Sequence, residues 1–334
     1  MLEKQIPSDQ QIIDCLKSHY NIQVVALTFL PLGADMNASV YKADTQYQSS
    51  YFVKLKHGHH HDISIDILEL LSNSGIQQII LPIKTTMAQS IQFINDFSII
   101  VYPFVEGQNS FSRPLTDNQW LILGNTLKKI HEIDVPLSIQ HRLRRETYSP
   151  IWRETVRSLY QQLNAEPSSD KIADKLLAFM KKNIGVIHSL VDCAEHLAQN
   201  LQNASPKFVL CHSDLHAGNV LISDNTSIYI VDWDEPIMAP KERDLMFIGG
   251  GVGHVWNKQY QEALFYKGYG NVEINRSILT YYRNERIVED IALFALKLLL
   301  SSSVGANRAE MYKHFLEMFE PNGVVDIAFK ADEK

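Results

Sequence analysis

The sequence predicts an α+β protein with two lobes: a small lobe built on an antiparallel sheet with one helix, and a larger, mainly helical lobe. Three observations support this prediction. The chain has 334 residues, about twice the usual length of one domain. Short β-type runs fill the first part of the chain, whereas helical periodicity dominates after Gly107. The composition, 45% hydrophobic and 21% charged, is that of a globular protein and excludes a mostly disordered chain.

The small lobe is expected to cover residues 1–103. A short amphipathic helix around Ile12–Leu16 begins it. The longer helix of this lobe is predicted over residues 62–72, because Ile63, Ile67 and Leu71 recur at helical spacing and share one face. Turn residues separate five β-type runs, which we predict as strands at residues 24–30, 38–43, 51–55, 79–83 and 97–104.

After a hinge at residues 104–108, the larger lobe is expected to cover residues 109–334. Its helical region spans about residues 115–204 and begins where Thr116 can cap a helix that runs to about Ile133. Two β-like runs, VLISD and SIYIVDW, flank a turn at Asn225-Thr226 and predict a hairpin. Helical patterning resumes from Asp244, with three consecutive glycines at residues 249–251.

Charge, cysteine usage and hydropathy limit the class of function. With 31 Lys and Arg against 38 Asp and Glu, the net charge of −7 disfavours generic binding to nucleic acid. Cys15, Cys193 and Cys211 are far apart in the sequence, which suits a reducing compartment. The apolar run Ile291–Leu300 is interrupted by Lys297 and is too short to span a bilayer. We therefore expect a cytoplasmic protein with no membrane, nucleic-acid or obligate protein partner.

The strongest chemical signal is the segment CHSDLHAGN at residues 211–219. It has the spacing His-x-Asp-x-x-x-x-Asn, from His212 through Asp214 to Asn219, and Asp232 follows at the end of the predicted hairpin. Phosphoryl transfer requires a carboxylate that orients the attacking hydroxyl and oxygen ligands for the magnesium ions on the phosphates. Asp214 can supply the first, and Asn219 and Asp232 can supply the second.

A metallohydrolase would use some of the same residues. His212, Asp214, His216, Asp232 and Asp234 are also plausible ligands of a dinuclear metal centre. The two interpretations differ in their need for a lysine on the other lobe.

That lysine is present in the strand YFVKLK. Lys54 and Lys56 are two residues apart, so both side chains are expected on one face of the strand. A kinase uses a strand lysine to hold the nucleotide phosphates and a carboxylate on the next helix to hold the lysine. A hydrolase needs neither.

These motifs together resemble the aminoglycoside phosphotransferase family, whose fold is protein-kinase-like. FVKL, the helix after it, VYPFVEG, HSDLHAGN and IVDWDE occur in the order and approximate spacing of that family. The block WDEP, KERDL and GGGVG, at residues 233–253, is similar to the spectinomycin-modifying members of the family. The similarity extends over most of the chain. It implies an ATP- and magnesium-dependent O-phosphotransferase acting on a small cationic antibiotic, with spectinomycin as the expected acceptor.

The resemblance also implies roles for individual residues. Asp214 matches the catalytic aspartate, Lys54 matches the lysine on the phosphates, and Asn219 and Asp232 match the ligands of two magnesium ions. A loop over the phosphates corresponds to residues 33–37 and ends at Asn37.

The segment 102–107 matches the interlobe linker that pairs with adenine. Because Pro103 has no N–H, it would offer its carbonyl, and Val105 would supply the donor.

Two departures from protein kinases argue against protein-kinase activity: the GxGxxGxV and APE motifs are missing, and VDWD stands in place of DFG. The carboxylate partner of Lys54 stays open among Asp62, Asp66 and Glu69, with Asp62 favoured because it begins the helix. We expect Asp244 to brace the catalytic loop rather than to touch substrate.

Acidic residues suit a cationic acceptor, and Asp234, Glu289 and Asp290 are the candidates for its binding surface. The last two lie in YYRNERIVED, where Arg283 and Arg286 could equally pair with them at helical spacing.

Two other functions remain open on sequence grounds. One is a kinase of a metabolite such as choline, homoserine, methylthioribose or a glycated lysine. The other is a non-catalytic nucleotide-binding protein, which the intact set of Lys54, Asp214, Asn219 and Asp232 disfavours.

Overall fold

The computed structural model describes residues 7–31, 38–47, 49–58, 62–163, 170–300 and 306–332. The chain forms two compact units, each built from several stretches of sequence. Unit 1 comprises Met1–Asn109, Val135–Arg142 and Val220–Pro236, and unit 2 comprises Ser110–Asp134, Leu143–Asn219 and Ile237–Lys334. We call residues 211–219 the catalytic segment, after the role predicted for them. The predicted hairpin that follows it therefore belongs to the same compact unit as the N-terminal sheet.

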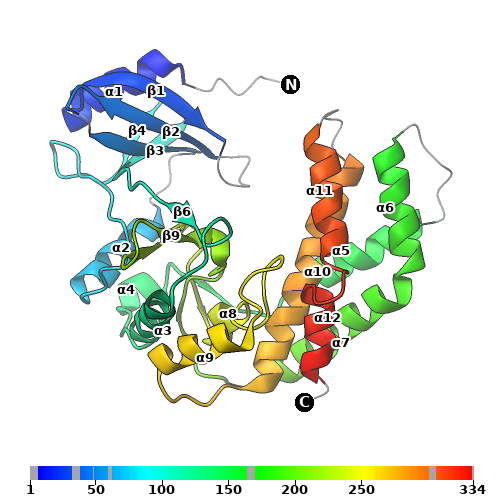
Figure 1. Cartoon of the computed structure of the whole chain (residues 1–334). Helices are drawn as coiled ribbons and strands as arrows, with labels where there is room; N and C mark the ends of the chain where they lie inside the picture. Colours follow the sequence, from blue (N-terminus) through cyan, green and yellow to red (C-terminus); the bar gives the residue numbers. More distant parts are fainter. Residues whose placement is uncertain are drawn as a thin grey trace. The chain divides into compact units, whose positions relative to one another are not determined.

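The main sheet of unit 1 is antiparallel, with the strand order β1-β2-β3-β5-β4 among the described residues (Figure 1). Its register pairs Lys54 of β3 with Val40 of β2 on one side and with Ile100 of β5 on the other. Lys54 thus lies on a strand that is hydrogen-bonded on both edges. The strands are β1 (Val24–Leu30), β2 (Ala38–Thr45), β3 (Ser50–His57), β4 (Gln92–Ile94) and β5 (Phe97–Pro103).

One face of this sheet is covered by α1 (Asp9–Tyr20). Ser8 and Gln11 form a capping box at the start of α1, and Ile12 and Leu16 are fully buried in the core shared with the sheet. The predicted short helix at residues 12–16 is therefore longer. The helix predicted over residues 62–72 is confirmed as α2 (Ile63–Asn73).

One predicted strand is wrong. Residues 79–83 form no strand, and the edge strand of the sheet is β4 instead. Pro82 has no N–H to give to a strand ladder, and the segment makes only isolated backbone contacts such as Ile83 N–H to Val101 O at 2.7 Å. β4 has three residues, too few for an alternating pattern to identify it.

Unit 1 also contains a second small sheet, in the order β10-β9-β6, and a short helix. The predicted hairpin is confirmed as β9 and β10, joined by a turn in which the Asp224 carboxylate accepts from the N–H groups of Thr226 and Ser227. The elements are β6 (Gln108–Asn109), β9 (Val220–Ile222), β10 (Ile228–Ile230) and α4 (Leu137–Gln140).

Unit 2 is mainly helical (Figure 1). The cap predicted at Thr116 is confirmed as a capping box with Gln119, and the helical region after residue 149 is present as α5 to α7. The helices are α3 (Asp117–His131), α5 (Ile151–Leu159), the 3-10 turn η1 (Tyr160–Gln162), α6 (Lys171–Lys182), α7 (Ile184–Gln202), η2 (Ala217–Asn219), α8 (Glu242–Leu245), α9 (Gln259–Tyr269), α10 (Arg276–Leu300), α11 (Ala306–Glu317) and α12 (Val324–Asp332). None of the described helices is long and apolar enough to cross a membrane.

Two features of unit 2 hold its functional segments. A short sheet, β7-β11-β8, consists of β7 (Arg144–Arg145), β11 (Ile237–Ala239) and β8 (Val209–Cys211), and β8 leads into the catalytic segment. A large apolar core joins α5, α6, α7, α10, α11 and α12 and includes Leu190, Ile291 and Phe315, all fully buried. This core fixes α10, the helix that carries the YYRNERIVED segment.

Candidate active site

In unit 1, two lysines of β3 and two aspartates after β10 form a cluster of ion pairs. Lys54 Nζ is 2.6 Å from Asp234 Oδ2 and 3.3 Å from Asp232 Oδ1. Lys56 Nζ is 3.1 Å from the other oxygen of Asp234. Both lysines reach one carboxylate, which confirms that they share a face of the strand. The cluster holds Lys54 in place among carboxylates.

The two aspartates are presented by a strained turn. Asp232 has φ +63°, a left-handed conformation that is uncommon for a residue other than glycine. Between them, Trp233 is buried and its indole N–H donates to Ile230 O at 3.0 Å, which anchors the turn. Asp234 is drawn to the lysines, whereas the Asp232 side chain is 49% exposed. The exposed carboxylate is the group of this cluster that remains open to a metal ion.

The prediction that Asp62 pairs with Lys54 is wrong, because Asp62 pairs with Lys56. Asp62 is the cap of α2, where one carboxylate oxygen accepts from Ser64 N–H at 3.0 Å and the other is 2.8 Å from Lys56 Nζ. Burial alone would raise the pKa of Asp62, but the charge and hydrogen bonds of Lys56 keep it below its ordinary value. The start of α2 is thus next to the second lysine of the strand, not the first.

The other two candidates for that role hold cations elsewhere in unit 1. Asp66 pairs with Arg142 at 2.6 Å, and Glu69 forms a short ion pair with Lys84. The partners of Lys54 come instead from the segment after the hairpin. The spacing of residues along α2 could not show this, because it depends on where the helix begins relative to β3.

The expected nucleotide linker follows β5. Pro103 is the last residue of that strand, and Val105 lies in the segment 104–107 that joins β5 to β6. Within the described chain, the Val105 N–H has no backbone partner, so it is available to an acceptor atom. Asn37, expected at the end of the loop over the phosphates, lies outside the described residues.

In unit 2, the Asp244 carboxylate holds the catalytic segment between β8 and η2 through hydrogen bonds to its backbone. One carboxylate oxygen of Asp244 accepts from Ser213 N–H at 2.8 Å, and the other accepts from His212 N–H at 2.9 Å. Ser213 has φ +78°, so the chain turns sharply just before Asp214. Arg243 reinforces the turn, because its Nε donates to Ser213 O at 3.0 Å. The predicted bracing role of Asp244 is confirmed.

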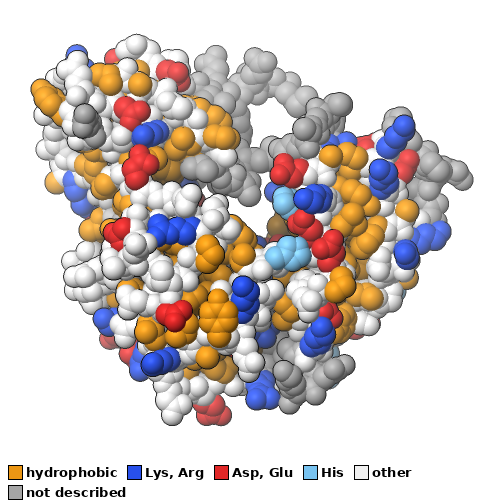
Figure 2. Space-filling view, viewed as in Figure 1, with side chains coloured by type: hydrophobic (Ala, Val, Ile, Leu, Met, Phe, Trp, Pro, Cys, Tyr) orange, Lys and Arg blue, Asp and Glu red, His pale blue; other side chains and the backbone are white. Residues whose placement is uncertain are grey.

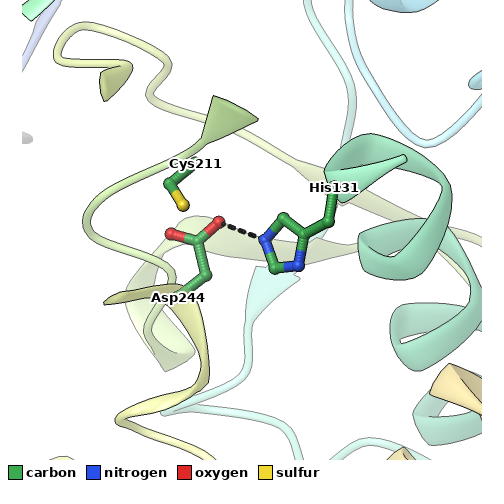
Figure 3. Close-up of side chains that lie close together, drawn as sticks. All are labelled: His131, Cys211 and Asp244. Atoms are coloured by element: carbon green, nitrogen blue, oxygen red, sulfur yellow. Dashed lines mark hydrogen bonds and ion pairs between the residues drawn. The ribbon is translucent and has the colours of Figure 1, made fainter. Parts of the chain in front are cut away.

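Three side chains beneath this loop also have the composition of a metal site (Figure 3). Ligand atoms of His131, Cys211 and Asp244 lie within 4.8 Å of one another, and all three residues are buried. His131 Nε2 is 3.0 Å from Asp244 Oδ2, and its Nδ1 is 2.7 Å from the Tyr269 hydroxyl. Burial raises the pKa of the Cys211 thiol well above its ordinary value. The thiol lies within hydrogen-bond distance of Ala239 O, at 3.7 Å, and of Pro240 O, at 3.6 Å. These groups satisfy one another, and we interpret them as a structural brace.

Asp214 is engaged by cationic or donor groups at both carboxylate oxygens. Its Oδ1 is 2.5 Å from Arg286 Nη1, and its Oδ2 is 3.4 Å from His216 Nε2. Gly218 N–H donates to His216 Nδ1 at 2.9 Å, so the proton of neutral His216 is on the nitrogen that faces Asp214. Burial alone would raise the pKa of Asp214, but His216 and Arg286 lower it well below its ordinary value. Asp214 is therefore ionised throughout the neutral range.

Asn219 completes the catalytic segment. Its amide nitrogen donates to Asp214 O at 2.9 Å, which fixes the side chain, and no described residue donates to its amide oxygen. An amide oxygen and an exposed carboxylate are donors that Mg²⁺ accepts, so Asn219 and Asp232 fit the expected metal in chemistry.

A cavity of about 570 Å³ lies in unit 2 beside Asp290 and Arg286. Its walls are mostly apolar, with Phe111, Phe247 and Phe294 among them. Glu317, which pairs with His314 at 2.9 Å, adds a second carboxylate to the lining. Figure 2 shows histidine and acidic side chains beside one another over the region of α10 and α11. Arg286 and His314, the partners of Asp290 and Glu317, also line the cavity, as does Arg283. A mostly apolar cavity with a few polar groups suits a compact small molecule.

The glycine-rich segment predicted from sequence forms part of this cavity. Gly250 and Gly251 both line it, and a Cβ on Gly250 would lie 2.2 Å from Met246 O. Glycine is required here because the backbone packs directly on the chain before it. Arg283 closes the same turn, donating to the carbonyls of Met246 and Ile248 at 3.0 and 2.7 Å.

The three residues expected to bind an acceptor are thus placed differently from one another. Asp290 lines the cavity and pairs with Arg286 at 3.0 Å, the alternative that helical spacing had left open. Glu289 is half-buried next to it, and burial raises its pKa. Asp234 lies with the lysines of unit 1. Sequence reasoning did not find Glu317, because nothing local links α11 to the catalytic segment.

Comparison with known proteins adds independent information. Residues 28–269 match the phosphotransferase enzyme family. Protein StrN of Streptomyces griseus is 24% identical over 254 residues, covering 73% of this chain and 77% of that protein. A crystal structure of spectinomycin phosphotransferase, APH(9)-Ia, in complex with ADP and spectinomycin is 50% identical, with a TM-score of 0.93, and covers 99% of this chain and 100% of that chain. Amicoumacin kinase hAmiN, 18% identical with a TM-score of 0.64 over 97% of both chains, shares the fold.

Proposed function

We propose, from the premise that this chain belongs to the phosphotransferase enzyme family, that it transfers the γ-phosphoryl group of ATP to a hydroxyl of spectinomycin. The chain is a kinase-type phosphotransferase. One observation carries the choice of acceptor: 50% identity over 99% of the chain with an enzyme that binds ADP and spectinomycin. The cavity in unit 2 supports the same choice.

On the nucleotide side, residues 1–103 and the linker 104–108 would bind ATP. Lys54 would steady the phosphates, with Asn37 in the loop over them. The carbonyl of Pro103 and the N–H of Val105 would hydrogen-bond to adenine. Asp62 would act indirectly, by holding Lys56 beside Lys54.

Asn219 and Asp232 would hold magnesium, most simply as two ions. When bound, magnesium neutralises the charge that develops on the phosphates. Asp232 would first exchange its ion pair with Lys54 for the metal. The free-energy cost of breaking that ion pair is small, because the Asp232 side chain is half-exposed and its contact with Lys54 is long, at 3.3 Å.

Residues 109–334 would bind the acceptor and carry out the transfer. Asp214 would accept a hydrogen bond from the reacting hydroxyl and then its proton, as the hydroxyl oxygen forms a bond to phosphorus and the bond to ADP breaks. Because the pKa of Asp214 is held low, its main contribution is to orient the hydroxyl, and the proton moves late.

Spectinomycin is a compact fused tricycle with two amines that are protonated near neutral pH. Apolar walls such as Phe247 would pack on the rings. The carboxylates of Glu317 and Asp290, in the cavity wall, would favour the positive charge. Glu289, next to Asp290 in sequence, would add to that charge although it is not part of the wall. Asp234, taken at first as an acceptor ligand, has both oxygens on lysines and would instead maintain the nucleotide side of the site.

The test is ATP turnover by the purified protein with a panel of acceptors: spectinomycin, multi-ring aminoglycosides, choline, homoserine, methylthioribose and a glycated lysine. We expect rapid turnover with spectinomycin alone, because a cavity shaped for a compact tricycle excludes additional rings by steric clash. Faster turnover with one of the metabolites would contradict the proposal.

A further inference from the structure

We propose that Arg286 is a positioning residue for the catalytic carboxylate of Asp214, and that Asp290 serves mainly to anchor Arg286. This inference rests on the proposed function, because it assigns a role within the same phosphoryl transfer. All three residues belong to unit 2, and two of them line its cavity.

The geometry is that of one guanidinium bridging two carboxylates. Arg286 Nη1 is 2.5 Å from Asp214 Oδ1, and Arg286 Nε is 3.0 Å from Asp290 Oδ1. A guanidinium is planar and its donors are fixed relative to one another, so the position of Asp290 determines where Nη1 presents its proton. An ammonium group has no such fork and cannot make both contacts in this arrangement.

Arg286 itself is held firmly. Its neighbours in sequence, Ile287 and Val288, are buried in the helical core, which fixes α10. Its guanidinium carbon lies 5.3 Å from the centre of the Phe247 ring, a cation–π contact. The helix backbone, the Phe247 ring and the Asp290 carboxylate thus hold Arg286 in one position. A side chain held in this way can fix the Asp214 carboxylate that it contacts.

The consequence concerns the two oxygens of Asp214. Arg286 occupies Oδ1, whereas Oδ2 has only the 3.4 Å contact with His216 among the described residues. An incoming hydroxyl can therefore approach Oδ2 while Oδ1 stays held. This is the arrangement of a base oriented by a third group, here an arginine in place of the usual carboxylate.

This arrangement also reassigns Asp290. Its Oδ1 already carries Arg286, and the pair with Asp214 leaves a net charge of −1 over the three side chains. Asp290 thus adds less attraction for a cationic acceptor than its place in the cavity wall suggests. Glu317 has two cationic partners, His314 at 2.9 Å and Lys313 at 3.6 Å, but both are more exposed to solvent than Arg286. Solvent screens their charge more, so Glu317 is the stronger candidate for that attraction.

The first experiment measures steady-state kinetics with ATP and spectinomycin for Arg286→Gln, Arg286→Lys and Asp290→Asn. We expect kcat to fall about 10- to 100-fold for Arg286→Gln, with both KM values within about 3-fold of wild type, because misorientation affects the chemical step. Arg286→Lys should recover little. Lys297→Gln, on the exposed side of the same helix, is the control and should match wild type.

The second experiment distinguishes action through Asp214 from direct contact with substrate. In an Asp214→Asn background, Arg286→Gln should cost less than about 2-fold in kcat, because the group that Arg286 positions is already disabled. A full additional loss in that background would mean that Arg286 contacts the phosphoryl group itself. A rise in acceptor KM would mean that it binds the acceptor. Either result overturns the inference.

These outcomes are separable from failure of the proposed function. If Asp214→Asn keeps wild-type turnover, the assigned chemistry is wrong and the inference falls with it. If Asp214→Asn is inactive but Arg286→Gln keeps wild-type kcat, only the inference is wrong. Thermal unfolding identifies variants that do not fold. Should Arg286→Gln be one of them, unchanged kcat in both Arg286→Lys and Asp290→Asn would overturn the inference.

Discussion

At the scale of single residues, the ion-pair cluster of unit 1 makes Lys54 and Lys56 unequal. Lys54 touches Asp232 and Asp234, whereas Lys56 touches Asp234 and the cap residue of α2. The phosphate contact proposed for Lys54 therefore predicts different effects of the two lysines, although they are neighbours on one strand face.

Lys54→Ala should raise the KM for ATP about 10-fold or more, because one charge-assisted contact to phosphate is lost. Lys56→Ala should have a smaller effect on that KM, and Lys84→Ala, whose partners are Glu69 and Ser90, should have none. Steady-state kinetics with varied ATP measures all three. A larger effect from Lys56 than from Lys54 would reverse the assignment.

Asp214→Asn should retain the fold and nucleotide binding, because the amide is isosteric. It should lower kcat on the order of 10²- to 10⁴-fold, because a neutral amide orients the hydroxyl less strongly than a carboxylate and cannot take its proton. Circular dichroism and ATP-binding calorimetry provide the controls. Near-normal turnover by a folded variant would remove Asp214 from the mechanism.

The sequence could predict residues whose chemistry fixes both type and spacing. Asp214 and Asn219 stand out because phosphoryl transfer needs those groups a short loop apart. Pairings made in three dimensions were less accessible: Asp62 reaches Lys56 rather than Lys54, and Arg286 reaches Asp214 across 72 residues of sequence. A local pattern can indicate only partners that are close in sequence. Helical spacing indicated the pair of Arg286 with Asp290, but not the pair of Arg286 with Asp214.

At the scale of elements, the contact of α3 with α9 depends on close approach of two backbones. A Cβ at Gly268 of α9 would lie 2.1 Å from Leu121 O of α3, so no side chain fits there. Gly185, near the start of α7, has open space around the same position.

Gly268→Ala should therefore destabilise the protein by about 1–3 kcal/mol through overpacking. Gly185→Ala should stabilise it by about 0.5 kcal/mol, because alanine has the higher helix propensity. Chemical denaturation of the two variants against wild type makes the comparison. Equal effects would show that the α3–α9 contact is less close than described.

The contact of α5 with α10 contains a buried charge network. Arg153 forms a short ion pair with Glu285, and it also donates to Glu195 Oε2 at 3.1 Å and to Tyr148 O at 3.0 Å. Burial raises the pKa of Glu285 to about 7, despite the attraction of Arg153. Below the pKa of a free glutamate, Glu285 is protonated in both the folded and the unfolded state. Between that pKa and about pH 7, Glu285 is protonated in the folded state only.

The folded state therefore loses stability from this group as pH rises through that window. Wild type should lose about 2–3 kcal/mol relative to Glu285→Gln between about pH 5 and about pH 8. Denaturant unfolding of both proteins at the two pH values measures the difference. A gap that does not change with pH would show that Glu285 titrates normally.

Elements with a cap and a clear period were predictable, as α3 and the β9–β10 hairpin show. The three-residue strand β4 and the bounds of α1 were not, because a short strand has too few residues for a pattern and a helix end depends on its cap. The two-lobed α+β fold is confirmed by the kinase-like structures that match nearly the whole chain.

At the scale of the whole molecule, the groups proposed to bind the nucleotide and those proposed to bind the acceptor lie mainly in different compact units. The lysine cluster and the linker belong to unit 1, and the catalytic segment and the cavity belong to unit 2. Carboxylates dominate the net charge of −7, which is compatible with a cationic small molecule and unfavourable for polyanions. We propose that this molecule phosphorylates spectinomycin.

Expression of the chain in spectinomycin-sensitive bacteria tests that claim most directly, with Asp214→Asn expressed to the same level as the control. We expect resistance to spectinomycin from the wild-type chain only. Mass spectrometry of the drug recovered from those cells should show the addition of one phosphoryl group at a single hydroxyl. A soluble wild-type protein that binds ATP, confers no resistance and leaves the drug unmodified would contradict the claim.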